Sequence, residues 1–175
     1  MNVGEPLLRT ERLELWQPRP GDMPGLVELL ADDETRRFLG SAEANEKSQF
    51  EKLLRNAGGW ALYGYGAFHV RLHGAPHIIA RCGVFHTWRG FGQGMDDVPE
   101  AGWIVHRDHW GKGIAGEAMR AAIAWFDQTQ GSRRIAAMIE DGNAASQKVA
   151  AMLGFAEYGR HEFEGSPVIL YERLP

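Results

Sequence analysis

A glycine-rich stretch lies between a predicted strand and a long predicted helix. It covers residues 109–118 and reads HWGKGIAGEA. Glycine lets the backbone approach phosphate oxygens without a Cβ in the way, and it tolerates positive φ angles. The first N–H groups of a helix have no partner within the helix, so they attract negative charge. The stretch therefore indicates a site for the pyrophosphate of a nucleotide-like ligand, with Lys112 adding a positive charge.

The common nucleotide-binding patterns do not describe this stretch. The phosphate loop of nucleotide hydrolases requires Ser or Thr after its Gly-Lys pair, but Gly113 follows Lys112. The dinucleotide fingerprint has a different glycine spacing and opens an alternating strand-helix order, which this chain lacks. An isolated glycine pair such as Gly111 and Gly113 would indicate only a tight turn. The surrounding sequence has to decide between these interpretations.

Two pairs of histidines raise the question of a metal site. They are His73 with His77 and His106 with His109. Pro76 interrupts the first interval, and the second pair lies across the predicted end of a strand. Neither pair has further ligands that would complete a coordination sphere. We expect no metal.

Composition and charge narrow the class of protein. The chain has 175 residues, 44% of them hydrophobic, and a formal net charge of −4. This size suits a single domain over residues 1–175, and the charge predicts no nucleic-acid partner. No apolar run is long enough to span a membrane, and residues 1–6 do not resemble a signal peptide, so we expect a cytoplasmic protein with no membrane partner. The single cysteine, Cys82, lies in an apolar run and is predicted to be a buried structural thiol.

The periodicity of apolar residues predicts seven strands and four helices. The strands are expected at residues 13–17, 67–72, 78–85, 100–106, 135–139, 155–160 and 167–173. The helices are expected at residues 24–31, 42–57, 112–130 and 143–153, with Asp22 capping the first and Phe50, Leu53 and Leu54 forming the apolar stripe of the second. The second and third strands form a hairpin. This order indicates an α/β (α+β) fold with a largely antiparallel front half.

Several segments together resemble a known family. Trp110-Gly111-Lys112-Gly113-Ile114-Ala115 followed by Glu117-Ala118 is similar to the acetyl-CoA loop of the GNAT acetyltransferases, in their RimJ/RimL-like branch. The resemblance extends, in the right order, from residue 8 to residue 171. Its other motifs are LRTERLEL at residues 8–15, EAGWI at 100–104, NAAS at 143–146 and LGF at 153–155. It implies one domain with a central, mostly antiparallel mixed sheet of about seven strands flanked by about four helices.

The resemblance also implies a cofactor and the residues that bind it. Acetyl-CoA would be the acetyl donor, with its pantetheine arm beside the strand that contains Trp103, Ile104 and Val105. Ser146 would hydrogen-bond the departing thiolate, and Asn143 would meet the cofactor arm, although a helix-capping role competes with both. The pyrophosphate would bind the loop and first helical turn, which are formed by Trp110, Gly111, Lys112, Gly113, Ile114, Ala115 and Gly116. Here Gly116 replaces a hydroxyl residue that is commoner in the family.

The catalytic groups are less completely indicated. An alkylamine is mostly protonated near neutral pH, so a carboxylate would help to deprotonate it before attack. Glu100, at the entrance of the cofactor strand, is the leading base, with Glu162 and Glu164 as alternatives and a solvated charge as the competing interpretation. Ala150 stands where several relatives have a tyrosine that acts as general acid. The identity of the acid is therefore open.

The predicted activity is acetyl transfer from acetyl-CoA to a primary amine by direct attack on the thioester. The acceptor could be a protein N-terminus, a ribosomal protein or a small amine. The missing tyrosine suggests a second hypothesis, a non-catalytic coenzyme A-binding sensor or assembly module. Both a monomer and a homodimer are compatible with the sequence.

Overall fold

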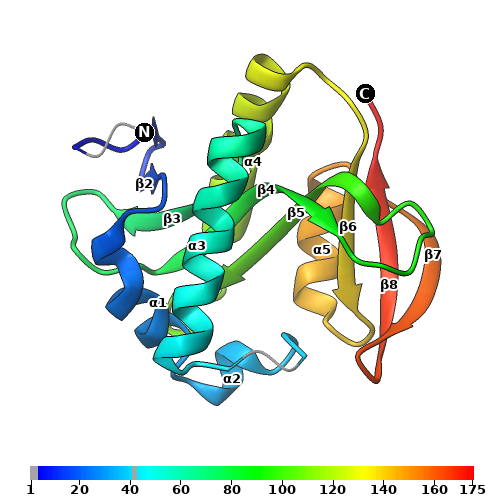
Figure 1. The fold of residues 1–175 in the computed structure, drawn as a ribbon, viewed down its shortest axis with the longest axis horizontal. Helices are drawn as coiled ribbons and strands as arrows, with labels where there is room; N and C mark the ends of the chain where they lie inside the picture. Colours follow the sequence, from blue (N-terminus) through cyan, green and yellow to red (C-terminus); the bar gives the residue numbers. More distant parts are fainter. Residues whose placement is uncertain (1–3, 41–42) are drawn as a thin grey trace.

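A computed structural model describes residues 4–40 and 43–175. In this part of the chain, eight strands form one sheet in the order β1-β2-β3-β4-β5-β6-β8-β7 (Figure 1). Neighbouring strands are antiparallel, except for β5 and β6, which are parallel. The strand and helix numbers are close to those expected, and the α+β class with a mostly antiparallel mixed sheet is confirmed.

Two observed elements were not predicted from the sequence, because they are too short to show a period of apolar residues. They are the strand β1 (Leu8–Arg9) and the helix α2 (Asp33–Arg36). The other strands are β2 (Leu13–Trp16), β3 (Ala67–Leu72), β4 (Ala80–Trp88), β5 (Asp96–Val105), β6 (Ile135–Glu140), β7 (Ala156–Phe163) and β8 (Ser166–Arg173). The other α-helices are α1 (Met23–Leu29), α3 (Glu46–Tyr63), α4 (Ile114–Gln130) and α5 (Ala144–Met152), with single 3-10 turns at Pro20–Asp22 and Arg107–His109.

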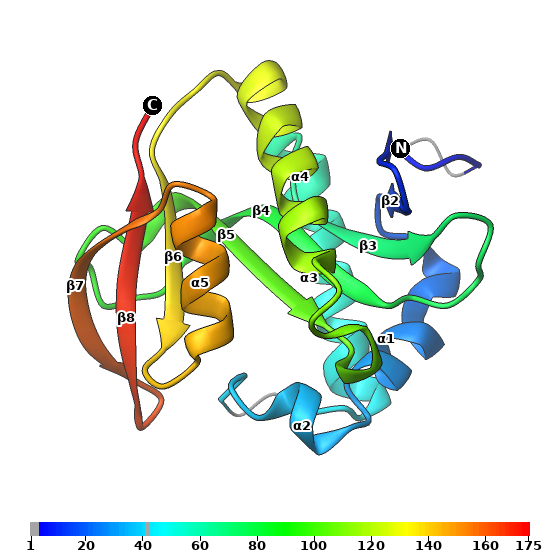
Figure 2. The same ribbon diagram turned by 180° about the vertical axis from the view of Figure 1, so that it is seen from behind.

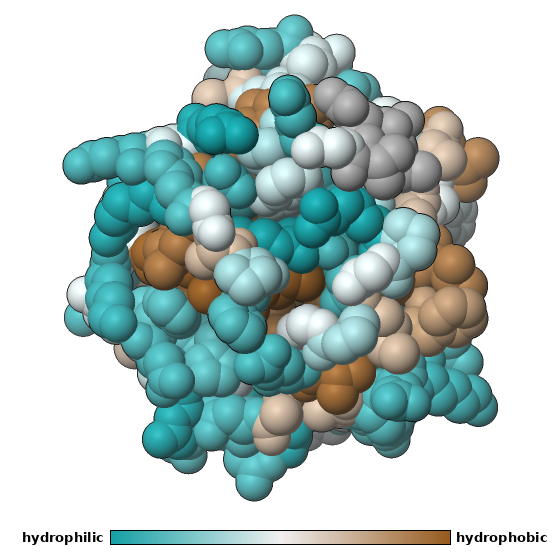
Figure 3. Space-filling model, turned by 90° about the vertical axis from the view of Figure 1, so that its left-hand side faces the viewer, coloured by the Kyte–Doolittle hydropathy of each residue, from teal (hydrophilic) through white to brown (hydrophobic). Residues whose placement is uncertain are grey.

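The helices form a layer on each face of the sheet. α1 and α3 cover one face in Figure 1, and α4 and α5 cover the other in Figure 2. The main core joins the sheet to α4 and α5, and Cys82 is buried within it, as expected. Burial raises the pKa of the Cys82 thiol to about 12. The face at the β2 and β3 side is mainly hydrophilic, with separate hydrophobic patches (Figure 3).

The second predicted helix differs from the observed one in its extent and its buried face. α3 begins after Asn45, whose side chain accepts a hydrogen bond from the Ser48 amide (2.9 Å), and it ends at Gly64, which has a φ of 78°. The predicted start at residue 42 lies outside the described residues. The predicted stripe is wrong in part, since only Leu53 is buried, whereas Phe50 and Leu54 are 52% and 56% exposed. The buried face of α3 contains Gln49, Leu53 and Trp60 instead.

The predicted role of Asp22 is also wrong. Asp22 immediately precedes α1, but its side chain makes no capping hydrogen bond to that helix. Its carboxylate is buried and accepts hydrogen bonds from His69 Nδ1 and Arg71 Nη2, each over 2.6 Å. These two residues of β3 thus hold Asp22 between α1 and the sheet. The first turn of α1 contains Pro24, which has no amide proton that would need a cap.

The strands β5 and β6 separate soon after they meet. Their register contains one pair, Glu100 with Ala136. Beyond it the two strands diverge, and α5 lies over the opening (Figure 2). This parallel pair is where the sheet leaves room for another extended segment.

Candidate functional site

The turn before α4 exposes a set of backbone amides. Gly111 and Gly113 have φ angles of 69° and 75°, which L side chains rarely adopt. Gly113 is the N-cap, and its carbonyl accepts the first helical hydrogen bond from the Glu117 amide (3.0 Å). The amides of residues 114–116 therefore have no partner within the helix. The positive end of the 17-residue α4 and these amides form an anion site.

A cavity of about 480 Å³ joins this turn to the opening between β5 and β6. All the predicted cofactor-binding residues except Lys112 line it. They are Trp103, Ile104, Val105, Trp110, Gly111, Gly113, Ile114, Ala115, Gly116, Asn143 and Ser146. One end of the cavity thus offers helix amides, and the other offers the edge of β5 and the first turn of α5. An elongated ligand with an anionic group and an amide-bearing arm suits such a space.

Lys112 lies apart from the other predicted residues. Its Nζ donates a hydrogen bond to the Asp108 carbonyl (2.7 Å), and it does not line the cavity. Its own carbonyl accepts a hydrogen bond from Arg12 Nη1 (2.8 Å). Trp110 also braces the loop, because its Nε1 donates to the Val105 carbonyl over 2.7 Å. The side chain of Trp110 thus ties the loop to the end of β5, and that of Lys112 ties it to the 3-10 turn after β5.

Two predicted residues meet across the opening. Trp103 Nε1 on β5 donates a hydrogen bond to Ser146 Oγ on α5 over 3.2 Å. Because this oxygen acts as an acceptor, the hydroxyl proton of Ser146 can be donated elsewhere. Asn143 Oδ1 accepts from the Ser146 amide (3.1 Å), so Asn143 does cap α5. Both side chains also line the cavity, so the capping role of Asn143 does not remove either residue from the site.

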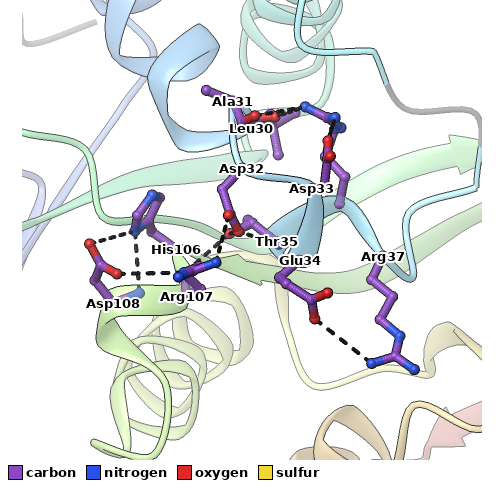
Figure 4. Close-up of polar contacts among 11 residues, drawn as sticks. Leu30, Ala31, Asp32, Asp33, Glu34, Thr35, Arg37, His106, Arg107 and Asp108 are labelled. Carbon is purple, nitrogen blue, oxygen red and sulfur yellow. Dashed lines mark hydrogen bonds and ion pairs between the residues drawn. The ribbon is translucent and has the colours of Figure 1, made fainter.

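The short helix α2 closes one side of the cavity through Glu34, Thr35, Phe38 and Leu39, the last two just beyond its end. Figure 4 shows how it is held. Asp32 caps α2 by accepting from the Thr35 amide (2.8 Å), and Arg107 Nη1 donates to Asp32 Oδ1 (3.0 Å). The Arg107 amide also donates to Thr35 Oγ1 (3.1 Å). Although desolvation opposes ionisation of Asp32, these donors lower its pKa. Arg107, two positions after the end of β5, thereby fixes the position of α2.

A second, smaller cavity of about 70 Å³ lies at the inner end of the opening. We call it the throat. It is lined by Phe38, Leu39, Ala101, Gly102, Trp103, Met138, Ile139, Glu140, Asn143 and Ser146. It shares Phe38, Leu39, Trp103, Asn143 and Ser146 with the large cavity, so the two are neighbouring parts of one site.

The structure does not bring Glu100 together with these residues. Its carboxylate is 3% exposed and accepts two hydrogen bonds from Arg89, from Nε over 2.8 Å and from Nη2 over 2.5 Å. Burial alone would lower the pKa of Arg89, but the paired Glu100 raises it. The alternatives Glu162 and Glu164 are exposed near the turn between β7 and β8, and neither lines the two cavities. Ala150 is fully buried in the main core.

Sequence reasoning missed several residues that line the site. Those on α4 and α5 share a helix face with predicted residues, so helical spacing could have identified them, and they are Arg120, Ala145, Val149 and Met152. His109 could have been found as part of the glycine-rich stretch. The α2 residues and Glu140 carried no such signal, because their place in the site depends on the tertiary fold.

Two other kinds of site are absent from the described part of the chain. Within residues 4–40 and 43–175, no three His, Cys, Asp or Glu residues converge as metal ligands would. No helix found there is both long and apolar enough to cross a membrane.

Comparison with known proteins assigns the family. The family model described as "Acetyltransferase (GNAT) domain" matches residues 12–156. The YkkB protein of Bacillus subtilis is 36% identical over 168 residues, which cover 95% of this chain and 94% of that protein. The N-acetyltransferase p20 of Bacillus licheniformis is 27% identical over 153 residues, with 87% and 83% covered. A solved GnaT-family acetyltransferase from Bordetella pertussis has a TM-score of 0.85 at 31% identity, with 95% and 98% of the chains covered. This chain therefore belongs to the GNAT family and is an acetyl-CoA-dependent N-acetyltransferase.

Proposed function

We propose that the protein acetylates a primary amine by direct attack of the amine on the thioester of acetyl-CoA, as a member of the RimJ/RimL-like branch. One observation supports this most strongly. Residues 114–116, with their free helix amides, and the Trp103–Ser146 pair line a single cavity of about 480 Å³. The amides suit a pyrophosphate, and the edge of β5 suits an amide-bearing arm. The branch assignment rests on the ordered motifs from residue 8 to residue 171.

In this proposal Ser146 is the general acid. The bond from Trp103 Nε1 to Ser146 Oγ orients the hydroxyl and leaves its proton free. That proton can be donated to the thiolate as the carbon–sulfur bond breaks. Ser146 can thereby replace the tyrosine that Ala150 does not provide. The sequence assigns the role of base to Glu100, and replacing it by glutamine tests that assignment.

The activity is tested by measuring thiol release from acetyl-CoA with a panel of amines. The panel contains alkylamines, amino acids and short peptides with free N-termini. We expect at least one primary amine to be acetylated, with the N-acetyl product identified by mass. Tight binding of acetyl-CoA without turnover on any amine would contradict the proposal and favour the non-catalytic module.

The cofactor site is tested with a matched pair of glycine variants. Gly113→Val places a branched side chain at the exposed amides that begin α4. Gly131→Val places the same side chain at the other end of α4, and the φ angles of the two glycines are similar, 75° and 80°. Both variants carry the strain of a positive φ, but only Gly113 lines the cavity. We expect acetyl-CoA binding, measured by calorimetry, to weaken about tenfold or more in Gly113→Val alone, because the branched side chain keeps the phosphates from the amides. Equal affinities would exclude this loop as the pyrophosphate site.

A further inference from the structure

Glu140 places a carboxylate at the throat, and no structural role of this carboxylate is evident from its contacts. It is the last residue of β6, it is half-buried, and it lines the throat together with Gly102, Trp103 and Ser146. No hydrogen bond or ion pair joins its carboxylate to another residue within the described ranges. Half-burying a carboxylate without a partner costs free energy, so such a group is a candidate for function.

The alternation of β6 indicates the direction of this side chain. Ile135, Ala137 and Ile139 pack into the main core beneath α4 and α5. Ala136 and Met138 belong to a separate cluster on the other face of the sheet. Glu140 follows this two-residue period, so it lies on the Met138 face. Figure 1 shows β6 from this side, which α5 does not cover.

The throat therefore connects two sides of the sheet. Ser146 and Asn143 line it from α5, and Glu140 belongs to the opposite face. A donor whose arm follows β5 from the α4 side would bring its thioester to the throat. An acceptor approaching from the other face would meet Glu140 first.

Glu100 is in a different situation. Both of its oxygens accept from Arg89, and it lies outside both cavities. Of the two glutamates, only Glu140 combines an accessible position in the throat with oxygens that are free to accept a proton.

We infer that Glu140 is the general base that deprotonates the acceptor amine. This inference rests on the proposed function and replaces the sequence-based assignment of Glu100. Glu140 takes one proton from the ammonium group and passes it to solvent. The nitrogen lone pair then forms a bond to the carbonyl carbon, the carbon–sulfur bond breaks, and its electron pair stays on sulfur. Glu140 takes the second N–H proton from the nitrogen and passes it to solvent. The thiolate takes a proton from Ser146, and solvent reprotonates Ser146, so that one proton is released overall.

The test compares two acceptors that differ in their need for a base. A primary alkylamine such as benzylamine is mostly protonated at pH 7, whereas O-methylhydroxylamine is already neutral. We expect Glu140→Gln to lower transfer to benzylamine about a hundredfold. The loss with O-methylhydroxylamine should be less than about tenfold, because no ammonium proton has to be removed. Glu140→Asp should recover part of the activity toward benzylamine.

The controls separate a catalytic role from a structural one. Asp141→Asn changes the next carboxylate, which is exposed and paired with Arg160 (3.1 Å), and it should leave both rates unchanged. Acetyl-CoA affinity and melting temperature should be the same in Glu140→Gln and the wild type. Equal losses with both acceptors, or a loss in Glu100→Gln but not in Glu140→Gln, would overturn the inference while leaving the proposed function intact. A wild-type protein that acetylates no amine would instead refute the proposed function.

Discussion

The carboxylate of Glu117 on α4 is bound by Arg12, a residue 105 positions earlier in the chain. Glu117 Oε1 accepts from the Arg12 amide (3.0 Å), and Oε2 accepts from Arg12 Nε (2.7 Å). Desolvation opposes ionisation of Glu117, but Thr10 and Arg12 together lower its pKa. Since Arg12 also donates to the Lys112 carbonyl, the turn between β1 and β2 holds the glycine-rich loop before α4 from outside.

We expect Glu117→Gln to weaken acetyl-CoA binding about tenfold, the effect of losing one charge-assisted hydrogen bond. The loop would lose its support, whereas the catalytic groups would stay in place, so KM should rise with little change in kcat. Asp127→Asn is the matched control, because Asp127 is also on α4 and pairs with an arginine, Arg173 (2.8 Å), away from the cavity. Calorimetry on both variants is the measurement. An unchanged affinity in Glu117→Gln would show that the loop needs no such support.

We expect a serine at position 116 to disturb the site. A Cβ at this position would clash with Met152 Cε, so Gly116→Ser must displace the Met152 side chain, which lines the cavity. We expect the serine variant to bind acetyl-CoA less tightly. The double variant Gly116→Ser/Met152→Ala should recover the affinity, because the shortened side chain frees the space. Additive effects of the two substitutions in a double-mutant cycle would refute this coupling.

Arg107→Ala should loosen α2 and thereby the wall of the cavity. The substitution removes the hydrogen bond to Asp32 and leaves the Thr35 contact with the backbone. We expect the KM for acetyl-CoA to rise about threefold, consistent with an exposed ion pair. Arg160→Ala, which removes a surface arginine distant from α2, should not change KM. Steady-state kinetics would decide, and identical KM values would exclude a role for this contact.

The buried pair of Asp22 and His69 should make stability depend on pH. Burial lowers the pKa of His69, although Asp22 opposes this. An unfolded chain binds a proton at this histidine below about pH 6.5, and the folded chain does not, so the free energy of unfolding should fall as pH decreases from there. Asp22 extends the loss to lower pH, because His69 and Arg71 lower its pKa against the effect of burial.

This pH dependence can be measured by denaturant unfolding between pH 7.5 and 5, a range of roughly one unit above and below the histidine titration. His69→Gln should show a smaller slope of unfolding free energy against pH than the wild type. His77→Gln is the control, because that side chain is largely exposed. Parallel curves for the wild type and His69→Gln would contradict the assignment.

The parts of the site that follow a local rule could be predicted from the sequence. Gly111 and Gly113 were identified because few other residues allow such a turn before a helix, and α4 was found because its apolar face repeats with the helical period. The hairpin of β3 and β4 followed from alternation and a Gly-Pro turn. These features depend on neighbours within a few positions.

The parts that depend on distant contacts could not be predicted. α2 has four residues and no period, and its place at the cavity depends on distant contacts such as those from Arg107 to Asp32 and Thr35. Phe50 and Leu54 have the spacing of a buried stripe, yet both are exposed, and Leu53 packs with residues of α1. The family motifs predicted that Glu100 lies near the strand expected to bind the cofactor. They could not show that both oxygens of its carboxylate accept hydrogen bonds from Arg89.

The single register pair between β5 and β6 has a consequence for the protein as a whole. Without a ligand, strands β1 to β5 and strands β6 to β8 share one short stretch of backbone pairing, at Glu100 and Ala136. A donor molecule whose amides pair with β5 would act as an extra strand in the gap. Alternate amides of residues 101–105 already pair with β4. We therefore expect those that point away from β4 to exchange their hydrogens quickly in the free protein and slowly when acetyl-CoA is bound. The substrate would then complete the sheet that binds it.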